Sequence, residues 1–466
     1  MTNQNKFSES FLNSILGIGE SVNSTKDLIK WISFVRNNTI VKIKRVNFDE
    51  LKQWKFIEKK GVLKHHSGKF FSIQGLLCSN SWTNLSWEQP IINQPEIGYL
   101  GILCKEINGV LHFLLQTKIE PGNKNYVQLS PTLQATRSNF TSVHGGKKPE
   151  YLKYFKNSTN QEVIVDCLQS EQGSRFYKKR NRNIIIKINH EIEIKENFKW
   201  VTLSQIKDLL KKDNIINMDT RSVISCINIT KYITAASETH SINGNEFFKS
   251  IIEEEESKTE LVLNKFIDFK FNLETKNKII PLNKINNWEI KKDKIGHVNK
   301  KYFEVIANKI EIDSREVICW DQPMIKPIGK GYCILFIKKI NNIVYLLSQI
   351  KSEPGIFDLV ELAPTIQTNN LENYSKDKII KFYLNSKNKF SIIHESYQSE
   401  EGGRFYKEDN KNIIIKLFDK NSFNDLPINY CWISLSDALF INSTNHLFNI
   451  QLRSLISLID YKKIIK

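Results

Sequence analysis

The sequence has 466 residues, of which 40% are hydrophobic, and this length and composition predict a globular protein of two to three domains. The formal net charge of +17 comes from 67 Lys and Arg against 50 Asp and Glu, and it fits either a polyanionic partner or a small anionic substrate. Lysine is spread along the whole chain, and the densest basic group, between Lys178 and Arg182, is short. Most of the positive charge is therefore expected on the solvated surface.

The sequence carries no sign of secretion or membrane insertion. Its N-terminal residues lack a positive region followed by a long apolar run, and no run of about 18 apolar residues occurs anywhere. Seven cysteines form no CxxC pair and lie in apolar, strand-like runs. These patterns predict a cytoplasmic protein with reduced, buried cysteines and no membrane partner.

The first part of the chain is predicted to be helical and peripheral through residue 45, with a helix over Thr25–Asn37 whose apolar side chains gather near one face. Asn108-Gly109 separates two strand-like runs, which predicts a tight hairpin, and Asn341-Asn342 occupies the same place downstream. Further elements are predicted in this order: a helix over 149–155, strands over 163–169 and 183–188, helices over 203–211 and 220–227, and a long helix over 245–270.

Phrases of the first half recur in the second half at nearly constant spacing. Residues 116–122 read QTKIEPG and 349–355 read QIKSEPG, while 169–177 read QSEQGSRFY and 398–406 read QSEEGGRFY. The chain is therefore predicted to be α+β with antiparallel pairing and an internal duplication, not a doubly wound parallel sheet. The predicted units are an N-terminal segment at 1–45, a first repeat at 46–228, a helical linker at 229–276 and a second repeat at 277–466.

Three phrases of the first half resemble signature segments of the NDP-hexose 2,3-dehydratase family: HHSGKFFSIQG, EPGNKNYVQLSPTLQATRSNFTSVHGG and QSEQGSRFYKKRNRN. The resemblance covers essentially the whole chain. It implies a homodimer whose subunit contains two tandem Nudix-like domains, with no redox or pyridoxal cofactor and no catalytic metal. The implied substrate is an NDP-4-keto-6-deoxyhexose, usually thymidine-linked, and the implied partner is a downstream NDP-sugar 3-ketoreductase.

A 4-keto sugar acidifies its C3 proton, so loss of the C2 hydroxyl requires three functions from the protein. These are a base at C3, a group that holds the C4 enolate oxygen and an acid for the departing hydroxyl. His65, His66 and His144 have pKa values suited to moving protons, and Glu120 or Glu171 could act as a base if burial raises its pKa. The oxyanion could be held by Lys118, Gln134 and Arg137.

The expected diphosphate contacts are Arg175 and Arg182, with Lys179 and Arg180 as supporting charge. An aromatic side chain could stack on the base. The full set of expected substrate-binding residues is Trp87, Tyr126, Gln128, Thr136, Asn139, Phe140, Gly145, Gly146, Glu171, Arg175, Tyr177, Lys179, Arg180 and Arg182.

Each of these assignments has a structural alternative. His65 and His66 could form a surface turn, and Glu120 or Asn139 could cap backbone amides. Arg175 has a counterpart in Arg404, so a structural ion pair competes with a role in binding, and an aromatic residue in a strand usually belongs to the core.

The two halves differ in their chemistry. Arg137 and the His144-Gly145-Gly146 run have no counterpart in the second half, where Lys179 and Arg180 become Glu408 and Asp409. A diphosphate pocket should keep its positive charge, so the working site is predicted in the first repeat and a degenerate pocket in the second.

Two other function classes fit parts of the sequence. A Nudix-type hydrolase of NDP-sugars would suit the implied fold, but no segment carries the carboxylate-rich helix that binds its metal. A nucleic-acid-binding protein would suit the positive charge, but the basic residues do not interleave with aromatic residues along a strip. No nucleic-acid partner is therefore expected.

Overall fold

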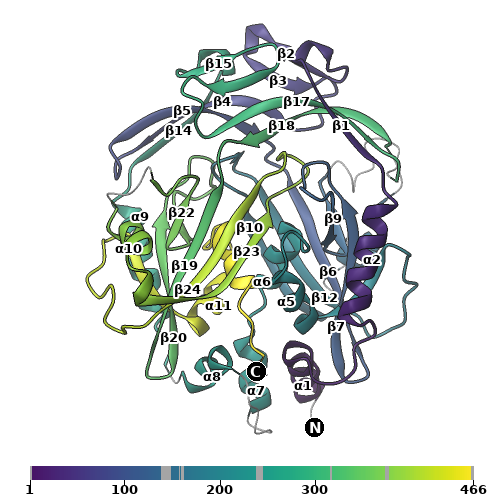
Figure 1. Cartoon of the computed structure of the whole chain (residues 1–466), viewed down its shortest axis with the longest axis vertical. Helices are drawn as coiled ribbons and strands as arrows, with labels where there is room; N and C mark the ends of the chain where they lie inside the picture. The colour runs from purple at the N-terminus through teal and green to yellow at the C-terminus, as the bar shows by residue number, and fades with distance from the viewer. Residues whose placement is uncertain are drawn as a thin grey trace.

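The computed structural model describes residues 3–137, 148–156, 158, 162–237, 245–254, 256–314, 317–372 and 377–462. These residues form a mixed α/β structure with four sheets. Figure 1 shows two small sheets lying together above two large sheets, with helices between the large sheets and below them. We call the sheets small sheet 1, small sheet 2, large sheet 1 and large sheet 2, according to the half of the chain that supplies most of their strands.

The strands and helices have the following bounds. Small sheet 1 contains β2 (Trp54–Ile57), β3 (Val62–His65), β4 (Ser72–Asn80), β5 (Leu85–Asn93), β11 (Phe176–Tyr177) and β14 (Thr275–Ile280). Small sheet 2 contains β1 (Val41–Val46), β15 (Trp288–Ile290), β16 (Lys294–His297), β17 (Phe303–Ile312) and β18 (Cys319–Pro327). Large sheet 1 contains β6 (Ile97–Ile107), β7 (Val110–Ile119), β8 (Val127–Ser130), β9 (Leu133–Ala135), β10 (Glu162–Ser170), β12 (Arg180–Lys187) and β13 (Phe198–Thr202). Large sheet 2 contains β19 (Gly331–Ile340), β20 (Ile343–Lys351), β21 (Glu361–Ala363), β22 (Ile366–Thr368), β23 (Phe390–Ser399), β24 (Asp409–Leu417) and β25 (Tyr430–Ser434). The helices are α1 (Asn3–Leu16), α2 (Thr25–Asn37), α4 (Leu152–Lys156), α5 (Leu203–Leu210), α6 (Met218–Ser225), α7 (Thr230–Ser237), α8 (Glu246–Glu253), α9 (Thr259–Phe271), α10 (Lys378–Asn385), α11 (Leu435–Asn442) and α12 (Ile450–Ser457).

The prediction of antiparallel pairing is correct for most strand pairs but incomplete. In large sheet 1, β12 runs parallel to β6, and in large sheet 2, β24 runs parallel to β19 in the same way. The two large sheets thus repeat the same strand order, including short strands that pair beside the main path.

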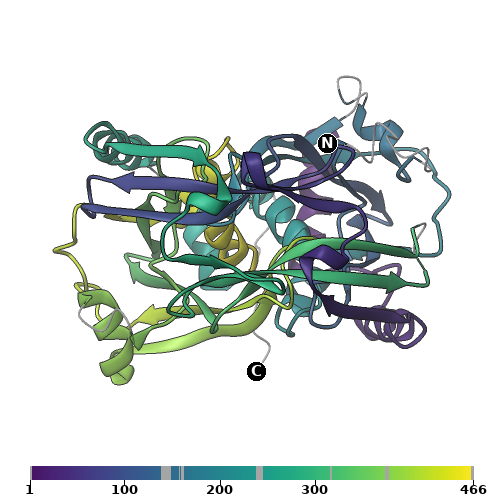
Figure 2. The same cartoon turned by 90° about the horizontal axis from the view of Figure 1, so that it is seen from above.

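Each half gives one strand to the small sheet of the other half. Strand β1 pairs antiparallel with β17 of small sheet 2, and β14 pairs antiparallel with β4 of small sheet 1. Two tryptophans repeat the exchange: Trp54 Nε1 donates to the carbonyl of Asp321 at 2.9 Å, and Trp288 Nε1 donates to the carbonyl of Glu88 at 2.8 Å. In Figures 1 and 2, β4 and β5 extend toward the side of large sheet 2, whereas β17 and β18 extend toward large sheet 1. The two halves are therefore interlocked.

The buried apolar residues also cross between the halves. One cluster joins small sheets 1 and 2 and includes Phe71 and Phe303. A larger cluster joins both large sheets through the helices between them and includes Phe113 and Leu335. The core is thus continuous across the two halves, and burial on this scale dominates the stability of such a chain.

Local predictions hold best where the sequence carries a local signal. Helix α2 has the predicted bounds, and the side chain of Ser24 caps its N-terminus. The hairpin residues Asn108 and Gly109 have φ of 50° and 74°, and Asn341 and Asn342 have φ of 47° and 67°, which confirms both predicted turns.

Other predictions were wrong in detail. Residues 41–45, predicted to belong to the helical N-terminal segment, lie in β1. Helix α1 is not peripheral, because Phe11 and Ile15 are fully buried in the main core. The long helix predicted over 245–270 is two helices, α8 and α9. Among the cysteines, Cys319 is exposed at the start of β18, whereas the other six are buried as predicted.

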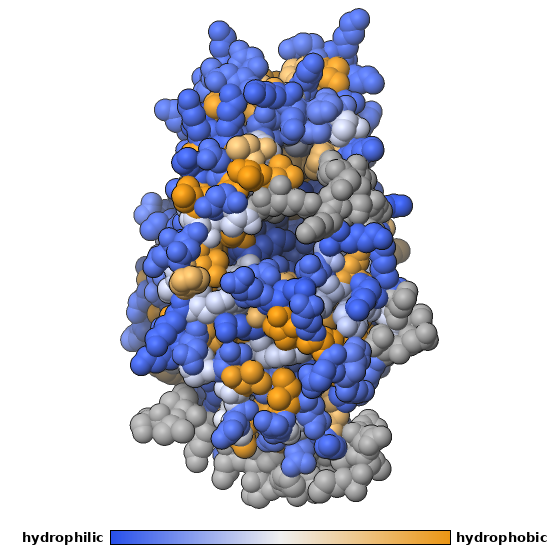
Figure 3. Space-filling model, turned by 90° about the vertical axis from the view of Figure 1, so that its right-hand side faces the viewer, coloured by the Kyte–Doolittle hydropathy of each residue, from blue (hydrophilic) through white to orange (hydrophobic). Residues whose placement is uncertain are grey.

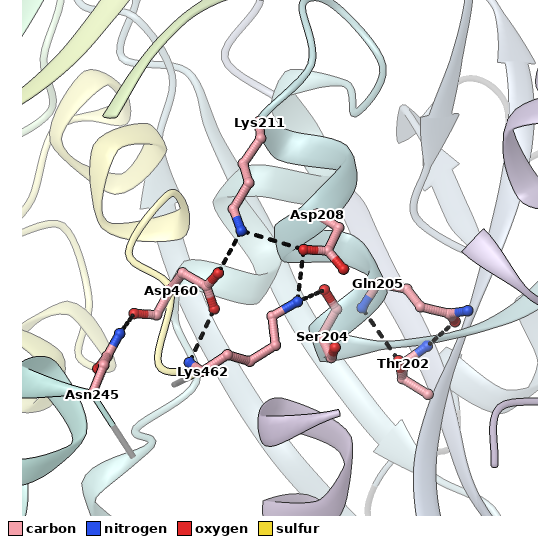
Figure 4. Close-up of polar contacts among 8 residues, drawn as sticks. All are labelled: Thr202, Ser204, Gln205, Asp208, Lys211, Asn245, Asp460 and Lys462. Carbon is pink, nitrogen blue, oxygen red and sulfur yellow. Dashed lines mark hydrogen bonds and ion pairs between the residues drawn. The ribbon is translucent and has the colours of Figure 1, made fainter. Parts of the chain in front are cut away.

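The C-terminal segment returns to the first half. Lys462 Nζ lies 2.6 Å from the carboxylate of Asp208 on α5, and Lys211 Nζ lies 2.8 Å from that of Asp460 (Figure 4). Asn245 Nδ2 donates to the carbonyl of Asp460 at 2.6 Å. These contacts hold residues 460–462 against α5. In the part of the chain that the structure describes, no helix is both long and apolar enough to cross a bilayer.

Candidate active site

A cavity of about 940 Å³ lies between the small sheets and large sheet 1. Its wall includes His65 on β3, Tyr99 on β6 and Lys118 on β7, together with Trp320 on β18 from the second half. Figure 3, viewed from the side of large sheet 1, shows a hollow with hydrophilic residues below the small sheets. Pockets of this size accommodate ligands such as a nucleotide-linked sugar.

A network of hydrogen bonds fixes the end of β7 against β9. Glu120 accepts from Gln134 Nε2 at 2.8 Å and from Asn123 Nδ2 at 3.2 Å. Lys118 Nζ donates to the carbonyl of Gln134 at 3.2 Å, and Asn217 Nδ2 donates to the side-chain oxygen of Gln134 at 3.2 Å. Both carboxylate oxygens of Glu120 are thus oriented by amide donors.

Most of this network recurs in the second half, although Glu353 Oε2 has no partner there among the described residues. Glu353 accepts from Gln367 Nε2 at 2.9 Å, Lys351 Nζ donates to the carbonyl of Gln367 at 3.4 Å, and Asn449 Nδ2 donates to Gln367 at 2.8 Å. Because both halves build it, this arrangement belongs to the shared architecture and is not specific to one pocket.

Glu171 and Lys179 form a buried pair of opposite charges at the cavity wall. Burial raises the pKa of Glu171, and the nearby ammonium of Lys179 opposes that rise. One oxygen of Glu171 accepts from Asn181, and the other, Oε2, is buried without a partner among the described residues. Burial lowers the pKa of Lys179, whose Nζ donates to the carbonyl of Glu96 at 2.6 Å.

The second half completes the cavity with the loop that contains Glu401 and Arg404. The N–H of Gly122 donates to the carbonyl of Gly402 at 2.7 Å, and the N–H of Lys407 donates to that of Gly122 at 2.6 Å. A Cβ at Gly122 would lie 1.7 Å from the carbonyl oxygen of Phe405, so this crossing requires glycine. The loop after β23 thereby reaches the cavity of the first half.

Arg404 lies over an aromatic ring and faces the cavity. Its guanidinium carbon is 4.7 Å from the ring centroid of Phe71, and one terminal nitrogen donates to Gln94 Oε1 at 3.3 Å. Its Nε is buried without a partner among the described residues. A cation held in this way suits an anionic ligand group.

Asp219 and Glu401 add two further carboxyl groups to the cavity. Burial, together with the charges of Glu171, Glu120 and Glu401, raises the pKa of Asp219 well above its usual range. Burial raises the pKa of Glu401 to about 7, although Arg404 acts in the opposite direction. Both groups are therefore suited to proton transfer near neutral pH.

The predicted histidine pair forms a turn and also lines the cavity. The N–H of Gly68 donates to the carbonyl of His65 at 3.0 Å, and the N–H of Ser67 donates to His65 Nδ1 at 3.2 Å. The ring centroids of His65 and His66 are 4.3 Å apart. His65 is buried and His66 is exposed, so His66 is at the solvent side of the cavity.

The structure brings together only part of the predicted site. The residues that line the cavity are His65, His66, Lys118, Glu120, Gln134, Thr136, Glu171 and Lys179. Asn139, Phe140, His144, Gly145 and Gly146 lie outside the described residues, and Arg137, which precedes them, is exposed. The remaining predicted residues do not line this cavity: Trp87, Tyr126, Gln128, Arg175, Tyr177, Arg180 and Arg182.

The predicted basic contacts have other partners. The guanidinium carbon of Arg175 lies 4.3 Å from the ring centroid of Phe303 in the second half, and Arg175 is 3.9 Å from Glu408. Arg182 pairs with Asp166 at 2.6 Å, and Arg180 stacks on Phe357 at 3.9 Å. The loop with Arg175 reaches the second half, and the equivalent loop with Arg404 reaches the first half. Arg404 therefore lies in the first-half cavity, where Arg175 was expected.

Comparison with known proteins shows the family of this chain. The family model described as NDP-hexose 2,3-dehydratase matches twice, over residues 25–227 and 260–459. The chain belongs to the NDP-hexose 2,3-dehydratase family. It is 36% identical to the dTDP-4-dehydro-6-deoxy-alpha-D-glucopyranose 2,3-dehydratase of Saccharopolyspora spinosa, covering 96% of this chain and 93% of that protein. Proteins of the same name from Amycolatopsis orientalis and Streptomyces violaceoruber are each 35% identical, over 94% and 89% of this chain and 90% and 92% of their own length.

An NDP-hexose 2,3-dehydratase is a hydro-lyase, so family membership supports neither the hydrolase nor the nucleic-acid-binding alternative. In the described ranges, no three His, Cys, Asp or Glu side chains converge closely enough to hold one metal ion.

Sequence reasoning missed Asp219, Glu401 and Arg404. A usable signal was present, because QSEQG in the first half becomes QSEEG in the second, and the residue aligned with Asp219 is Gln451. The sequence does not show, however, that Glu401 lines the first-half cavity. That position becomes clear only from the structure, in which the loop after β23 crosses to the first half.

Proposed function

We propose that this protein removes the C2 hydroxyl of an NDP-4-keto-6-deoxyhexose and yields a 3,4-diketo-2,6-dideoxy sugar nucleotide. Thymidine-linked 4-keto-6-deoxyglucose is the expected substrate, because three relatives of similar length carry that substrate in their names. The observation that supports this most strongly is one cavity, among the described residues, that combines the cations Lys118, Lys179 and Arg404 with several buried carboxyl groups.

The charges divide the cavity by function. Arg404 and Lys179 suit the diphosphate, since both are cations held at the wall by neutral oxygen acceptors. Trp54, Phe70 and Trp320 offer apolar faces for the nucleoside. The sugar then lies toward Lys118, Gln134 and the carboxyl groups, where Lys118 would hold the oxygen at C4 as it gains negative charge.

Elimination requires proton transfer at two adjacent carbons. A base removes the C3 proton, and the C3–H electrons form an enolate whose negative charge lies on the C4 oxygen. The enolate electrons then form the C2=C3 double bond while the C2–O bond breaks and an acid protonates the departing oxygen. The resulting enol takes a proton at C2 and loses one from the C3 oxygen, which yields the diketone and one water. His65, His66, Glu120 and Glu171 remain candidates for orienting or relaying these protons.

We further propose that the two halves are Nudix-like units, at 46–228 and 277–466, that arose by duplication and that the second half holds a degenerate pocket. The repeated strand order and the double match of the family model support the duplication. A homodimer and a downstream NDP-sugar 3-ketoreductase follow from the family resemblance, and the buried, unpaired cysteines support a cytoplasmic location. The ketoreductase is needed because a 3,4-diketo sugar is reactive.

The proposed reaction can be tested directly. We expect that incubation with thymidine-linked 4-keto-6-deoxyglucose in deuterated water, with an NDP-sugar 3-ketoreductase and its reduced nicotinamide to trap the product, removes the C2 hydroxyl and places deuterium at C2. Mass spectrometry and proton NMR of the trapped sugar measure both changes. Unchanged sugar would contradict this substrate, and release of thymidine monophosphate with magnesium would favour a hydrolase.

A further inference from the structure

Several polar residues around the first cavity have counterparts in the second half of the chain. Glu120, Gln134 and Asn217 correspond to Glu353, Gln367 and Asn449, with the same hydrogen bonds in both halves. Helices α6 and α12 also begin identically, because Asn217 and Asn449 cap them with φ of −70° and ψ of 165°. Differences within this shared frame therefore identify what only one pocket needs.

Two carboxyl groups that line the first cavity have amide counterparts, one in each half of the chain. Asp219, at the second position of α6, corresponds to Gln451 on α12. Glu401, in the loop that crosses from the second half, corresponds to Gln172 in the loop that crosses the other way. An amide keeps the polarity and approximate size of a carboxyl group, but it cannot accept or release a proton in the physiological range. Asp219 and Glu401 therefore give the first cavity two groups that can transfer protons, and their amide counterparts Gln451 and Gln172 cannot do so.

Asp219 is placed to be neutral. It lines the cavity with 3% of its surface exposed, and no hydrogen-bond donor to its carboxyl group is found among the described residues. The carboxyl groups of Glu171, Glu120 and Glu401 all act on it, whereas Lys118 is the cation that opposes them. A carboxyl group without donors and beside other carboxylates keeps its proton.

Glu401 is placed to be ionised more readily. Glu401 Oε1 accepts a hydrogen bond from the N–H of Gly403 at 3.1 Å. The guanidinium of Arg404, three residues further along the chain, favours the charged form of Glu401. Its Oε2 is buried in the cavity wall without a partner among the described residues. An oxygen of this kind is available to a ligand.

We infer that Glu401 is the base that takes the C3 proton and that Asp219 is the acid that protonates the departing C2 hydroxyl. This inference rests on the proposed function. In the elimination, Glu401 gains the C3 proton and Asp219 loses its own to the leaving water. The proton on Glu401 exchanges with solvent, and in the enol step Glu401 delivers a proton to C2 while Asp219 takes one from the C3 oxygen. Both groups end as they began, and no other reactant is required.

Glu120 and Glu171 fit a supporting role better. Both oxygens of Glu120 already accept from amides, and the bond from Gln134 recurs in the second half as that from Gln367 to Glu353. Glu171 is bound by Asn181, just as Glu400 is bound by Asn410. These two carboxylates orient the wall and raise the proton affinity of Asp219.

The test compares Glu401→Gln and Asp219→Asn with Glu361→Gln, a control that removes a buried carboxyl group of the second half and installs the residue found at its counterpart, Gln128. We expect kcat with thymidine-linked 4-keto-6-deoxyglucose to fall by about 10²- to 10⁴-fold in both site variants and to change little in the control. Affinity for thymidine diphosphate should stay within a few-fold, and Glu401→Asp should recover part of the rate. In deuterated water, Asp219→Asn should still exchange the C3 hydrogen of recovered substrate, whereas Glu401→Gln should not.

Three results would overturn the inference. One is a site variant that keeps kcat within ten-fold of the wild type. Another is the reverse exchange pattern, with C3 exchange retained by Glu401→Gln and lost by Asp219→Asn. The third is a wild-type protein that leaves the sugar unchanged, which overturns the proposed function as well. A wild type that dehydrates the sugar alongside active variants would leave the proposed function intact and reject only these two roles.

Discussion

Replacing Arg404 by glutamine is expected to lower kcat/KM by about 10- to 100-fold, although Arg404 belongs to the second half of the chain. The reason is that its loop crosses to the first-half cavity, where the guanidinium stacks on Phe71 and keeps a buried Nε without a partner among the described residues. Glutamine would remove the charge that we propose binds the diphosphate. Steady-state kinetics with the keto sugar nucleotide measure the effect.

Arg175→Gln is the matched control. Arg175 stacks on Phe303 as Arg404 stacks on Phe71, but it lies on the other side of the exchanged loops and outside the cavity. We expect its kcat/KM to stay within a few-fold of the wild type. Equal losses in the two variants would mean that the diphosphate site is not where the cavity lies.

Replacing Arg221 by methionine is expected to reduce the free energy of unfolding by about 3–5 kcal/mol. Arg221 is 1% exposed, and its guanidinium donates to the carbonyl of Ser399 at 2.5 Å, to Ser454 Oγ at 2.7 Å and to the carbonyl of Ile216 at 2.7 Å. Methionine fills much of the volume but leaves these acceptors buried and unpaired. Because Ser399 and Ser454 belong to the second half, the loss weakens the junction between the halves.

Urea unfolding monitored by tryptophan fluorescence measures this change, with Arg45→Met as the control. Arg45 forms a partly exposed ion pair with Asp293 at 3.0 Å, and pairs of this kind contribute about 0–1 kcal/mol. If the two variants unfold at the same urea concentration, the buried guanidinium does not hold the halves together.

The sequence determined local structure well and long-range pairing poorly. Thr25–Asn37 became α2 because Ser24 caps it and one face is apolar, and Asn108-Gly109 became a hairpin because both residues accept positive φ. No local signal shows that β1 pairs with β17, since strand pairing depends on partners far apart in sequence. The burial of Phe11 has the same origin.

The site shows a similar division. Lys118 and Glu120 were predicted because the elimination requires a group that holds an oxyanion and a base, and both residues line the cavity. Arg175 was predicted to bind the diphosphate because it is positively charged and lies in the repeated segment QSEQGSRFY. Its charge does not show that its loop crosses to the other half, where Arg175 stacks on Phe303. Asp219 looked like an ordinary residue in the first turn of a helix, where acidic residues are common.

The exchange of β1 and β14 bears on how such a chain arose. A solitary unit would leave an open edge beside β4, where β14 now pairs. Two separate copies could close both edges by trading that strand, as in a domain-swapped dimer. The present chain has the connectivity of such a dimer fused head to tail. Fusion joins the two units in one chain, so the two units no longer need to have the same sequence. One unit could then keep carboxyl groups such as Asp219 at positions where the other has amides such as Gln451.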